Sequence, residues 1–311
     1  MKCSMVIWMR SSTPCITRIR LPSSLPSVMN NLTRRALLQH MRKRLQALQI
    51  DEAAIEAKHL LLHALQIKPE ELVMTDSQLL TSVEIDQCEA LIARREAGEP
   101  LSQLLGYRDF WKDRFTVTRD VLTPRADSEA LITAAVKQAK QYAAPQHILD
   151  LGTGTGCLGL SLLREFDTAR ATLVDRSESA LHVARCNANA LQLEHRCFFL
   201  QSNWVETLQS KYDMVITNPP YISTKEMPYL MPEVRDYEPA LALTAGEDGL
   251  DAYRYLVREV PRILAPGGSM ILELGAGQLD VVCQMATKQH WSVANVMPDL
   301  AGIARALTLT R

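Results

Sequence analysis

The chain lacks any apolar run long enough to cross a membrane. Among its 311 residues, the longest apolar stretches are interrupted by charge or by glycine before they reach the roughly 18 residues that a membrane-spanning helix needs. With 47% hydrophobic and 22% charged residues, the composition predicts a globular protein with a sizeable core in about two domains. We therefore expect no association with a membrane.

Cysteine pairs are lacking as well. The seven cysteines are odd in number and include no Cys-x-x-Cys pair, so the sequence predicts neither a disulfide framework nor a zinc site. We expect no bound metal. Cys157 lies beside a glycine-rich segment, but no histidine with a supporting acid lies at a suggestive position. A small core residue is therefore a simpler interpretation of Cys157 than a nucleophile.

Acidic residues are absent from the first fifty positions, which carry nine Lys and Arg; the first acid is Asp51. The remaining residues carry 25 Lys and Arg against 35 Asp and Glu. Because a duplex-DNA binder needs a broad positive face, we expect no direct contact with nucleic acid. The negative charge of this larger part suits a basic protein partner instead.

Residues 1–30 are rich in Ser, Thr, Pro and Arg, and no apolar period persists there, so we predict a poorly structured N-terminal extension. Three explanations compete. The start codon lies too early and Met29 or Met41 is the real beginning, the segment is a mitochondrial transit peptide, or it is a disordered arm. We favour the first explanation and a cytoplasmic location, with a mitochondrial one as the alternative.

A strand, a glycine loop and a helix are predicted in succession after residue 146. The apolar residues 147–151 lead into Gly152-Thr153-Gly154-Thr155-Gly156, and residues 157–163 continue as an apolar helix-like stretch. The glycines permit a tight turn and the close approach of a ligand, while the helix N-terminus offers unpaired N–H groups. The segment therefore predicts a nucleotide or cofactor site.

The spacing around this loop favours one cofactor. The predicted strand 171–175 ends in Asp175, roughly 20 residues after the loop, where an acid usually binds a ribose hydroxyl. The glycines fall at every second position, and Asp150 precedes them by two residues. This differs from the Gly-x-Gly-x-x-Gly pattern of nicotinamide cofactors and indicates S-adenosylmethionine.

A second motif, Asn218-Pro219-Pro220-Tyr221, closes the apolar run 212–217. The prolines fix φ and lack N–H groups, so the Asn218 amide is held rigidly at the end of the predicted strand. The Asn218 oxygen and the Pro219 carbonyl can accept the two hydrogens of a glutamine amide or an adenine amine, and Tyr221 can stack on its plane. Taken alone, the four residues are equally compatible with a stiff turn.

The two motifs lie about 62 residues apart, and together they are more specific than either alone. From about Thr33 to Arg311 the chain resembles the release factor glutamine methyltransferases of the HemK/PrmC family. Five further stretches carry the resemblance: residues 101–111, 121–125, 234–239, 243–249 and 299–303.

The resemblance implies a reaction and a set of site residues. The reaction is methyl transfer from S-adenosylmethionine to the glutamine side-chain amide in the Gly-Gly-Gln motif of class I release factors, which supports translation termination. Gly152, Thr153, Gly154, Thr155 and Gly156 would line the methionine moiety, Asp175 the ribose and Trp204 the adenine, with Asn218 beside the cofactor. Asn218, Pro219, Pro220 and Tyr221 would be the catalytic residues that hold the glutamine.

Two positions depart from the family pattern. Asn203 stands where the family usually has an acid, and Ala126 stands where it usually has a proline. The Asn203 oxygen can still accept a hydrogen bond from the adenine amine, but without a charge to strengthen it. Nearby, we expect Arg125 and Glu129 to form an exposed ion pair, with a role at the rim of the pocket as the alternative.

Alternating strand and helix patterns over residues 123–311 predict an α/β domain with a doubly wound sheet. Ile148, Ala171, Phe198, Asp213 and Ser269 mark its first five strands, and residues 266–268 the turn before the fifth. By family analogy, residues 291–296 and 306–310 complete a seven-stranded, Rossmann-like class I methyltransferase sheet with an antiparallel edge. Both motif loops would then lie at strand carboxyl ends, where ligands bind in such sheets.

Residues 31–105 show helical periodicity and predict a small helical domain, joined by a hairpin connector over 106–122 to the methyltransferase domain. One helix is expected over 83–97 with Ser82 near its cap. The apolar positions expected to bury one helix face are Leu37, Leu38, Met41, Leu45 and Leu48, then Ala54, Ile55, Leu60, Leu61, Leu62 and Leu65. The resemblance implies that this domain helps recognise the protein substrate, but a stabilising role is equally compatible with the sequence.

Three other functions stay open: a glutamine methyltransferase acting on a ribosomal protein, a DNA adenine methyltransferase, and a non-catalytic binding protein with the same fold. The segment at Pro124-Arg125 and the helical domain favour the release factor. The negatively charged body and the lack of a basic recognition insert argue against DNA. We expect a monomer.

Overall fold

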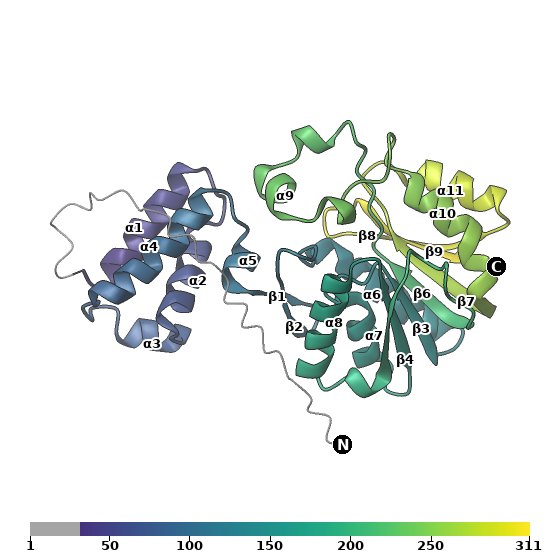
Figure 1. The fold of residues 1–311 in the computed structure, drawn as a ribbon, viewed down its shortest axis with the longest axis horizontal. Helices are drawn as coiled ribbons and strands as arrows, with labels where there is room; N and C mark the ends of the chain where they lie inside the picture. Colours follow the sequence, from purple (N-terminus) through teal and green to yellow (C-terminus); the bar gives the residue numbers. More distant parts are fainter. Residues whose placement is uncertain (1–31) are drawn as a thin grey trace, which may run out of the picture.

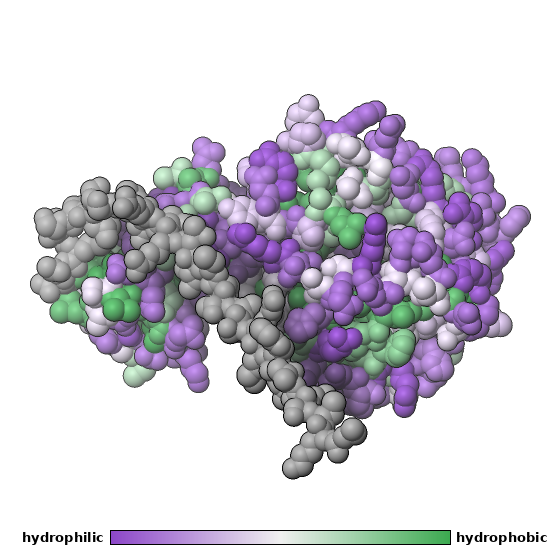
Figure 2. Space-filling view, viewed as in Figure 1, coloured by the Kyte–Doolittle hydropathy of each residue, from purple (hydrophilic) through white to green (hydrophobic). Residues whose placement is uncertain are grey.

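The computed structural model describes residues 32–311, so the predicted extension 1–30 lies outside the described residues. A bundle of short helices is followed by a β-hairpin and a larger α/β part (Figure 1). Hydrophilic residues cover most of the face seen in Figure 2, with hydrophobic residues in small scattered groups. Within the described range, no helix is long and apolar enough to cross a membrane.

The helical bundle contains α1 (Arg34–Ala47), α2 (Ala53–Leu65), α3 (Pro69–Met74), α4 (Ser82–Glu96) and α5 (Leu101–Leu105). Its core confirms part of the expected apolar stripe, because Leu37, Met41, Leu45, Leu60 and Leu61 are fully buried. Leu48 and Ile55 were wrongly expected in that core, since they are 47% and 52% exposed, and Ala54 is exposed as well. Leu48 lies beyond the last turn of α1, and Ile55 lies two residues from the buried Ala53, which places it on another helix face.

The N-terminus of α4 shows how local chemistry sets an element boundary. The Thr81 hydroxyl accepts a hydrogen bond from the Glu84 N–H at 3.3 Å, and the Glu84 carboxylate accepts one from the Thr81 N–H at 2.8 Å. This reciprocal pair is a capping box. The cap is therefore Thr81 and not Ser82.

The hairpin consists of β1 (Tyr107–Phe110) and β2 (Asp113–Thr116), paired antiparallel. A single 3₁₀ turn, η1 (Ala126–Ser128), then leads directly into α6 (Glu129–Gln141). Together, η1 and α6 connect the hairpin to the first strand of the large sheet. The turn η1 lies beside the site described below.

The seven-stranded sheet confirms the predicted fold class, with strand order β5-β4-β3-β6-β7-β9-β8. Its strands are β3 (His147–Leu151), β4 (Arg170–Asp175), β5 (Cys197–Gln201), β6 (Tyr212–Thr217), β7 (Leu264–Glu273), β8 (Ser292–Pro298) and β9 (Ala304–Thr310). The antiparallel strand is β9, which lies between β7 and the edge strand β8. The connecting helices are α7 (Cys157–Glu165), α8 (Glu178–Ala190), α9 (Pro232–Tyr237), α10 (Asp251–Glu259) and α11 (Leu279–Lys288).

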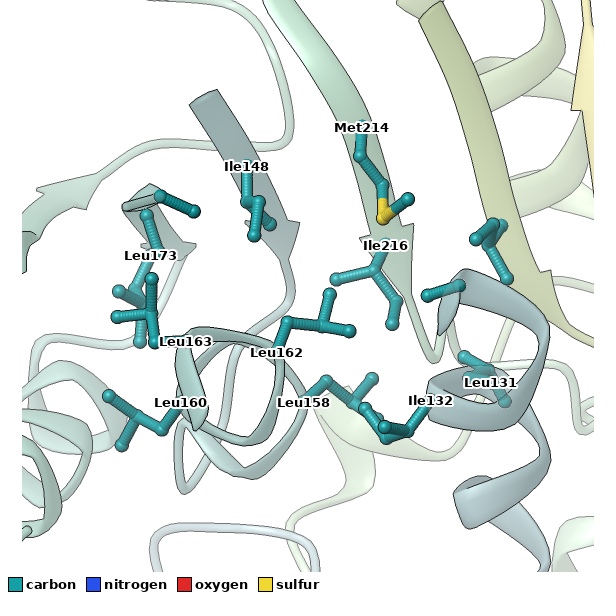
Figure 3. Packing of buried hydrophobic residues seen from close by; sticks show 14 of the residues in the cluster. Leu131, Ile132, Ile148, Leu158, Leu160, Leu162, Leu163, Leu173, Met214 and Ile216 are labelled. Atoms are coloured by element: carbon teal, nitrogen blue, oxygen red, sulfur yellow. The ribbon is translucent and has the colours of Figure 1, made fainter. Parts of the chain in front are cut away.

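Alternate residues of the central strands pack on opposite faces of the sheet. Ile148 and Ile216 join a core with α6, α7 and α8, whereas their neighbours Leu149 and Val215 join a core with α10 and α11. Figure 3 shows the first of these cores, with Leu158 and Leu162 of α7 packed between Ile132 of α6 and the strands. Because both faces are covered, the central strands are mostly apolar, as expected for buried parallel strands, with Asp150 of β3 and Thr217 of β6 as buried polar exceptions.

The predicted turn at residues 266–268 is wrong. Strand β7 already begins at Leu264 and runs through Pro266, Gly267 and Gly268, and its register against β6 shifts between Leu264 and Ser269. The extra residues bulge out of the ladder without ending the strand. Proline and glycine therefore mark an irregularity inside the strand here.

The order in which strands are added to the sheet changes side at β3 and β6. From β3 the chain moves outward through β4 and β5, and it then returns to place β6 on the other side of β3. The loops after β3 and β6 consequently diverge at neighbouring carboxyl ends, which opens a crevice at this edge of the sheet. Both sequence motifs lie in these loops.

Candidate active site

A cavity of about 480 Å³ lies at the carboxyl ends of β3, β4, β5 and β6. It brings together most of the site residues expected from the sequence. Those that line it are Gly152, Thr153, Gly154, Thr155, Asp175, Trp204, Asn218 and Pro220. Gly156, Pro219 and Tyr221 do not line this cavity.

The three glycines of the loop have different roles, although all have positive φ, at +69°, +54° and +83° for Gly152, Gly154 and Gly156. A Cβ on Gly154 would meet nothing within 4 Å, so this glycine borders open space. A Cβ on Gly156 would lie 3.0 Å from the Leu160 side chain and 3.3 Å from that of Ala184. Gly154 therefore leaves room for a ligand, whereas Gly156 allows the close packing of α7 beneath the loop.

Asp150 holds the loop from below. Its Oδ2 accepts hydrogen bonds from the Thr153 hydroxyl at 2.6 Å and from the Gly159 N–H at 2.9 Å. Among the described residues its Oδ1 has no partner. Burial raises the pKa of Asp150 to about 6, so the group is largely ionised at neutral pH. A buried negative charge under the loop suits a cationic ligand such as a sulfonium.

Asp175 ends β4 and faces the same cavity. Its Oδ2 accepts a hydrogen bond from the Gly154 N–H and its Oδ1 one from the Ser177 N–H, each at 2.9 Å. Burial raises the pKa of this carboxyl. Each carboxylate oxygen keeps a second lone pair, so the rigidly held group can accept from two neighbouring hydroxyls, as a ribose presents.

Trp204 supplies a flat apolar wall. Its indole packs against the Tyr255 ring with centroids 6.3 Å apart, and a Cβ on Gly152 would lie 3.8 Å from the indole. Beside it, the Asn203 side-chain nitrogen donates to Glu206. Asn203 lines the cavity, and its side-chain oxygen accepts no hydrogen bond from another described residue. A wall next to an acceptor fits an adenine ring and its amine.

Asn218 lies between two cavities. A smaller cavity of about 180 Å³ adjoins the first, and its lining includes Arg125, Asn218, Tyr221 and Val234. Asn218 and Arg125 line both cavities. The Asn218 side-chain nitrogen donates to the Ser128 hydroxyl at 3.2 Å. The arrangement places one amide between a space for a cofactor and a space for a small side chain.

Ser128 and Glu273, which lie behind Asn218, were not predicted as site residues from the sequence. Glu273, at the end of β7, accepts hydrogen bonds from the Ser128 hydroxyl and, at 3.4 Å, from the Tyr221 hydroxyl. Burial raises the pKa of Glu273 to about 7 and that of Tyr221 to about 12. The sequence does contain a signal for Glu273, because this acid directly follows the apolar run 270–272. Asp150 and Asp175 likewise lie at or near the end of an apolar run.

Arg125 and Glu129 do not form the expected exposed ion pair. Arg125 pairs with Glu238 at 2.7 Å, and the Glu238 side chain is only 1% exposed. Glu129 instead accepts a hydrogen bond from the Trp111 N–H at 2.9 Å. The expectation failed because the partner of Arg125 lies 113 positions away along the chain. Arg125 is thus a fixed cation at the border of the two cavities.

Cys157 lines the large cavity, but burial raises the pKa of its thiol to about 12. The thiol therefore stays protonated and is a poor nucleophile. Within residues 32–311 no group of three or more His, Cys, Asp or Glu side chains is placed to hold a metal ion.

Comparison with known proteins identifies the family. The chain is 43% identical over 265 residues to the release factor glutamine methyltransferase of Cereibacter sphaeroides, a match that covers 85% of this chain and 94% of that protein. The chain belongs to the release factor glutamine methyltransferase family. The enzyme of that name from Rhodospirillum rubrum is 37% identical, with 86% of this chain and 82% of that protein covered.

Family models and a solved structure agree with this membership. The model of the PrmC N-terminal domain matches residues 36–106, and that of the methyltransferase small domain matches residues 127–233. The solved structure of the hMettl16 catalytic domain in complex with MAT2A 3'UTR hairpin 6 is 13% identical, has a TM-score of 0.51, and is similar over 73% of this chain and 81% of that chain. It supports the class I methyltransferase fold. As a member of the release factor glutamine methyltransferase family, the chain is an S-adenosylmethionine-dependent methyltransferase.

Proposed function

We propose that this enzyme methylates the side-chain amide nitrogen of the glutamine in the Gly-Gly-Gln motif of class I release factors. The observation that carries the proposal is the position of Asn218 between a large and a small cavity. A cofactor in the large cavity and a glutamine side chain in the small one would meet at this amide. The names of the relatives from Cereibacter sphaeroides and Rhodospirillum rubrum agree with such a substrate.

The site residues divide into two proposed sets. The cofactor set is Gly152, Thr153, Gly154, Thr155 and Gly156 along the methionine moiety, Asp175 at the ribose, Trp204 at the adenine and Asn218 at the reacting end. The catalytic set is Asn218, Pro219, Pro220 and Tyr221. The cavity lining supports most of both sets, while Gly156 and Pro219 contribute through the loop backbone that they shape.

The proposed mechanism depends on positioning. S-adenosylmethionine, when bound, supplies an electrophilic methyl group on its sulfonium. The Asn218 oxygen and the Pro219 carbonyl accept the two amide hydrogens and direct the nitrogen lone pair toward the cofactor cavity. As the N–C bond forms and the C–S bond breaks, the nitrogen becomes acidic, and one proton leaves to a loop carbonyl or to water. Fixed acceptors stabilise the positive charge that develops on the nitrogen.

We propose further that the chain is organised as a helical domain over 31–105, a hairpin connector over 106–122 and a methyltransferase domain over 123–311. The helical domain would help to dock the release factor. Its contacts with α9, which borders the small cavity through Val234, support this role. We infer that the enzyme is a cytoplasmic monomer and that it makes no direct contact with nucleic acid.

Mass spectrometry of a purified class I release factor, incubated with this protein and S-adenosylmethionine, tests the proposal. We expect one added methyl group on the Gly-Gly-Gln glutamine, and none with Asn218→Ala. Ribosomal proteins and adenine-containing DNA serve as competing substrates in the same assay. Methylation of either in preference to the release factor would contradict the proposal.

A further inference from the structure

A chain of hydrogen bonds runs from Asn218 into the protein interior, and its first member after Asn218, Ser128, also lines the large cavity. Asn218 Nδ2 donates to Ser128 Oγ at 3.2 Å, and the Ser128 hydroxyl donates to Glu273 Oε2. The second oxygen of Glu273 accepts from the Tyr221 hydroxyl at 3.4 Å. Ser128 and Glu273 are 3% and 2% exposed. Three segments far apart in the sequence, η1, the end of β7 and the loop after β6, thus meet in one buried network.

The network has a direction. A serine hydroxyl has one proton to donate, and an ionised carboxylate can only accept. Ser128 therefore gives its proton to Glu273 and offers only lone pairs to Asn218. The amide group that can face those lone pairs is the NH2 of Asn218. Its oxygen is left to face the cavities, and among the hydrogen bonds of residues 32–311 that oxygen accepts none.

We propose that Ser128 and Glu273 are positioning residues that fix the orientation of the Asn218 amide, so that its oxygen meets the hydrogens of the substrate amide. With the amide reversed, its NH2 would face the substrate NH2, and the two donors would repel. The inference rests on the proposed function, because it concerns a substrate that presents N–H donors.

Other charged and titratable groups surround Glu273. Arg305 of β9 pairs with Asp127 of η1 at 3.3 Å, and the Tyr253 hydroxyl of α10 lies 3.1 Å from the Glu273 main-chain oxygen. Burial raises the pKa of Glu273 to about 7, and the nearby Arg305 charge opposes that rise. A protonated Glu273 can donate to Ser128, which then can donate to Asn218 and reverse the amide. The wild-type turnover should therefore fall as the pH falls through about 7.

Four variants separate positioning from a general loss of structure. Glu273→Gln keeps the shape of the side chain but brings an NH2 donor into the network, and Ser128→Ala removes the relay. We expect each to lower kcat for release factor methylation about tenfold, with little change in the Kd of S-adenosylmethionine. The double variant should be no slower than Ser128→Ala alone, because Glu273 reaches Asn218 through Ser128 and its contact with the Tyr221 hydroxyl, at 3.4 Å, is long. Ser128→Thr, which keeps the hydroxyl, should restore turnover.

Ser161→Ala is the matched control, since Ser161 is also fully buried but its hydroxyl has no partner within the described residues. Its kcat should stay unchanged. The pH profile gives a second test, because Glu273→Gln should remove the fall in kcat below about pH 7. Additive losses in the double variant, or an unchanged pH profile in Glu273→Gln, would overturn the inference. Absence of transfer by the wild-type enzyme would overturn the proposed function and the inference with it.

Discussion

Asn218 and Asp175 are both polar residues at strand ends, but they should affect different steps. The Asn218 oxygen is a candidate acceptor for the substrate amide, and Asn218 is one of many residues that line the large cavity. We expect Asn218→Ala to lower kcat by on the order of a hundredfold, the usual loss of one fixed polar group at a reacting centre. The Kd of S-adenosylmethionine, measured by calorimetry, should change less than about threefold. A larger loss of cofactor binding than of turnover would contradict this role.

Asp175 should act on binding, because its two oxygens are already oriented by the Gly154 and Ser177 N–H groups. Charge-assisted hydrogen bonds contribute about 1.5–3 kcal/mol, so Asp175→Ala should raise the Kd of S-adenosylmethionine roughly 10- to 100-fold. Asp175→Asn keeps the shape and removes the charge, and it should fall between the wild type and Asp175→Ala. Titration calorimetry measures all three. Equal affinities would show that the ribose is held elsewhere.

The buried Glu273 should also affect stability in a pH-dependent way. Its pKa rises from 4.5 to about 7 in the folded protein, mainly through burial, so between these values the folded state binds more protons than the unfolded state. Its contribution to stability is complete below about pH 4.5 and is lost as the pH rises through about 7. Glu273→Gln lacks this titration. Urea unfolding at pH 5 and at pH 8 measures this effect. From pH 5 to pH 8, the unfolding free energy of the wild type should fall by on the order of 2–3 kcal/mol more than that of Glu273→Gln.

Which site residues could be predicted depends on how local their signal is. Asp175 and the Asn218 motif end apolar runs, and the glycine loop has a pattern that a single segment carries. Ser128, Glu273 and Glu238 each have a partner at least 90 positions away. Such pairs depend on which loops the sheet order brings together, and one sequence does not contain that information locally.

At the scale of elements, the glycine loop and α7 offer a matched pair of substitutions. Both Gly154 and Gly156 have positive φ, so alanine at either should cost about 1–2 kcal/mol of unfolding free energy. Gly156→Ala also brings a Cβ to 3.0 Å from Leu160, and it should therefore be the less stable variant. Gly154→Ala places a methyl group at open space by the cavity, and it should mainly weaken cofactor binding. Thermal unfolding and cofactor titration of both variants test this division.

The elements themselves were predicted best where period and end signals agree. The apolar runs predicted for β3 and β6 agree with strands that are buried on two faces, and the seven strands agree with the sheet that the family resemblance implied. Proline and glycine misled the prediction in β7, because a bulge uses the same residues as a turn. The start of α4 was displaced by one residue, since Thr81 and Ser82 are both good caps and only Thr81 is three positions before a glutamate.

At the scale of the whole molecule, α9 joins the helical bundle to the site. Glu233 of α9 binds Arg95 of α4 at 3.0 Å, and Arg95 also binds Glu56 of α2 at 2.7 Å. The Tyr237 hydroxyl donates to the Ala97 main-chain oxygen at 3.0 Å. The same helix borders the small cavity through Val234. The position of the helical bundle is thus linked to the wall of the proposed glutamine pocket.

The ion pair between Glu233 and Arg95 can be removed without leaving the buried Arg95 charge unpaired. In Glu233→Gln, Arg95 keeps Glu56, so the unfolding free energy should fall by only about 0.5–1 kcal/mol. Arg95→Met removes the shared cation from two carboxylates and should cost about 3 kcal/mol. Urea unfolding followed by tryptophan fluorescence measures both losses. Similar losses in the two variants would mean that Glu56 gains nothing from Arg95.

The consequence for activity depends on the size of the substrate. If the bundle docks the release factor, Glu233→Gln should raise the KM for the whole protein several-fold, because the bundle is less firmly held relative to the site. A short peptide with the Gly-Gly-Gln motif reaches only the small cavity, so its KM and kcat should stay close to the wild-type values. An equal change for peptide and protein would instead assign α9 to the shape of the glutamine pocket. An unchanged KM for both substrates would show that the bundle does not take part in substrate recognition and that its role is to stabilise the protein.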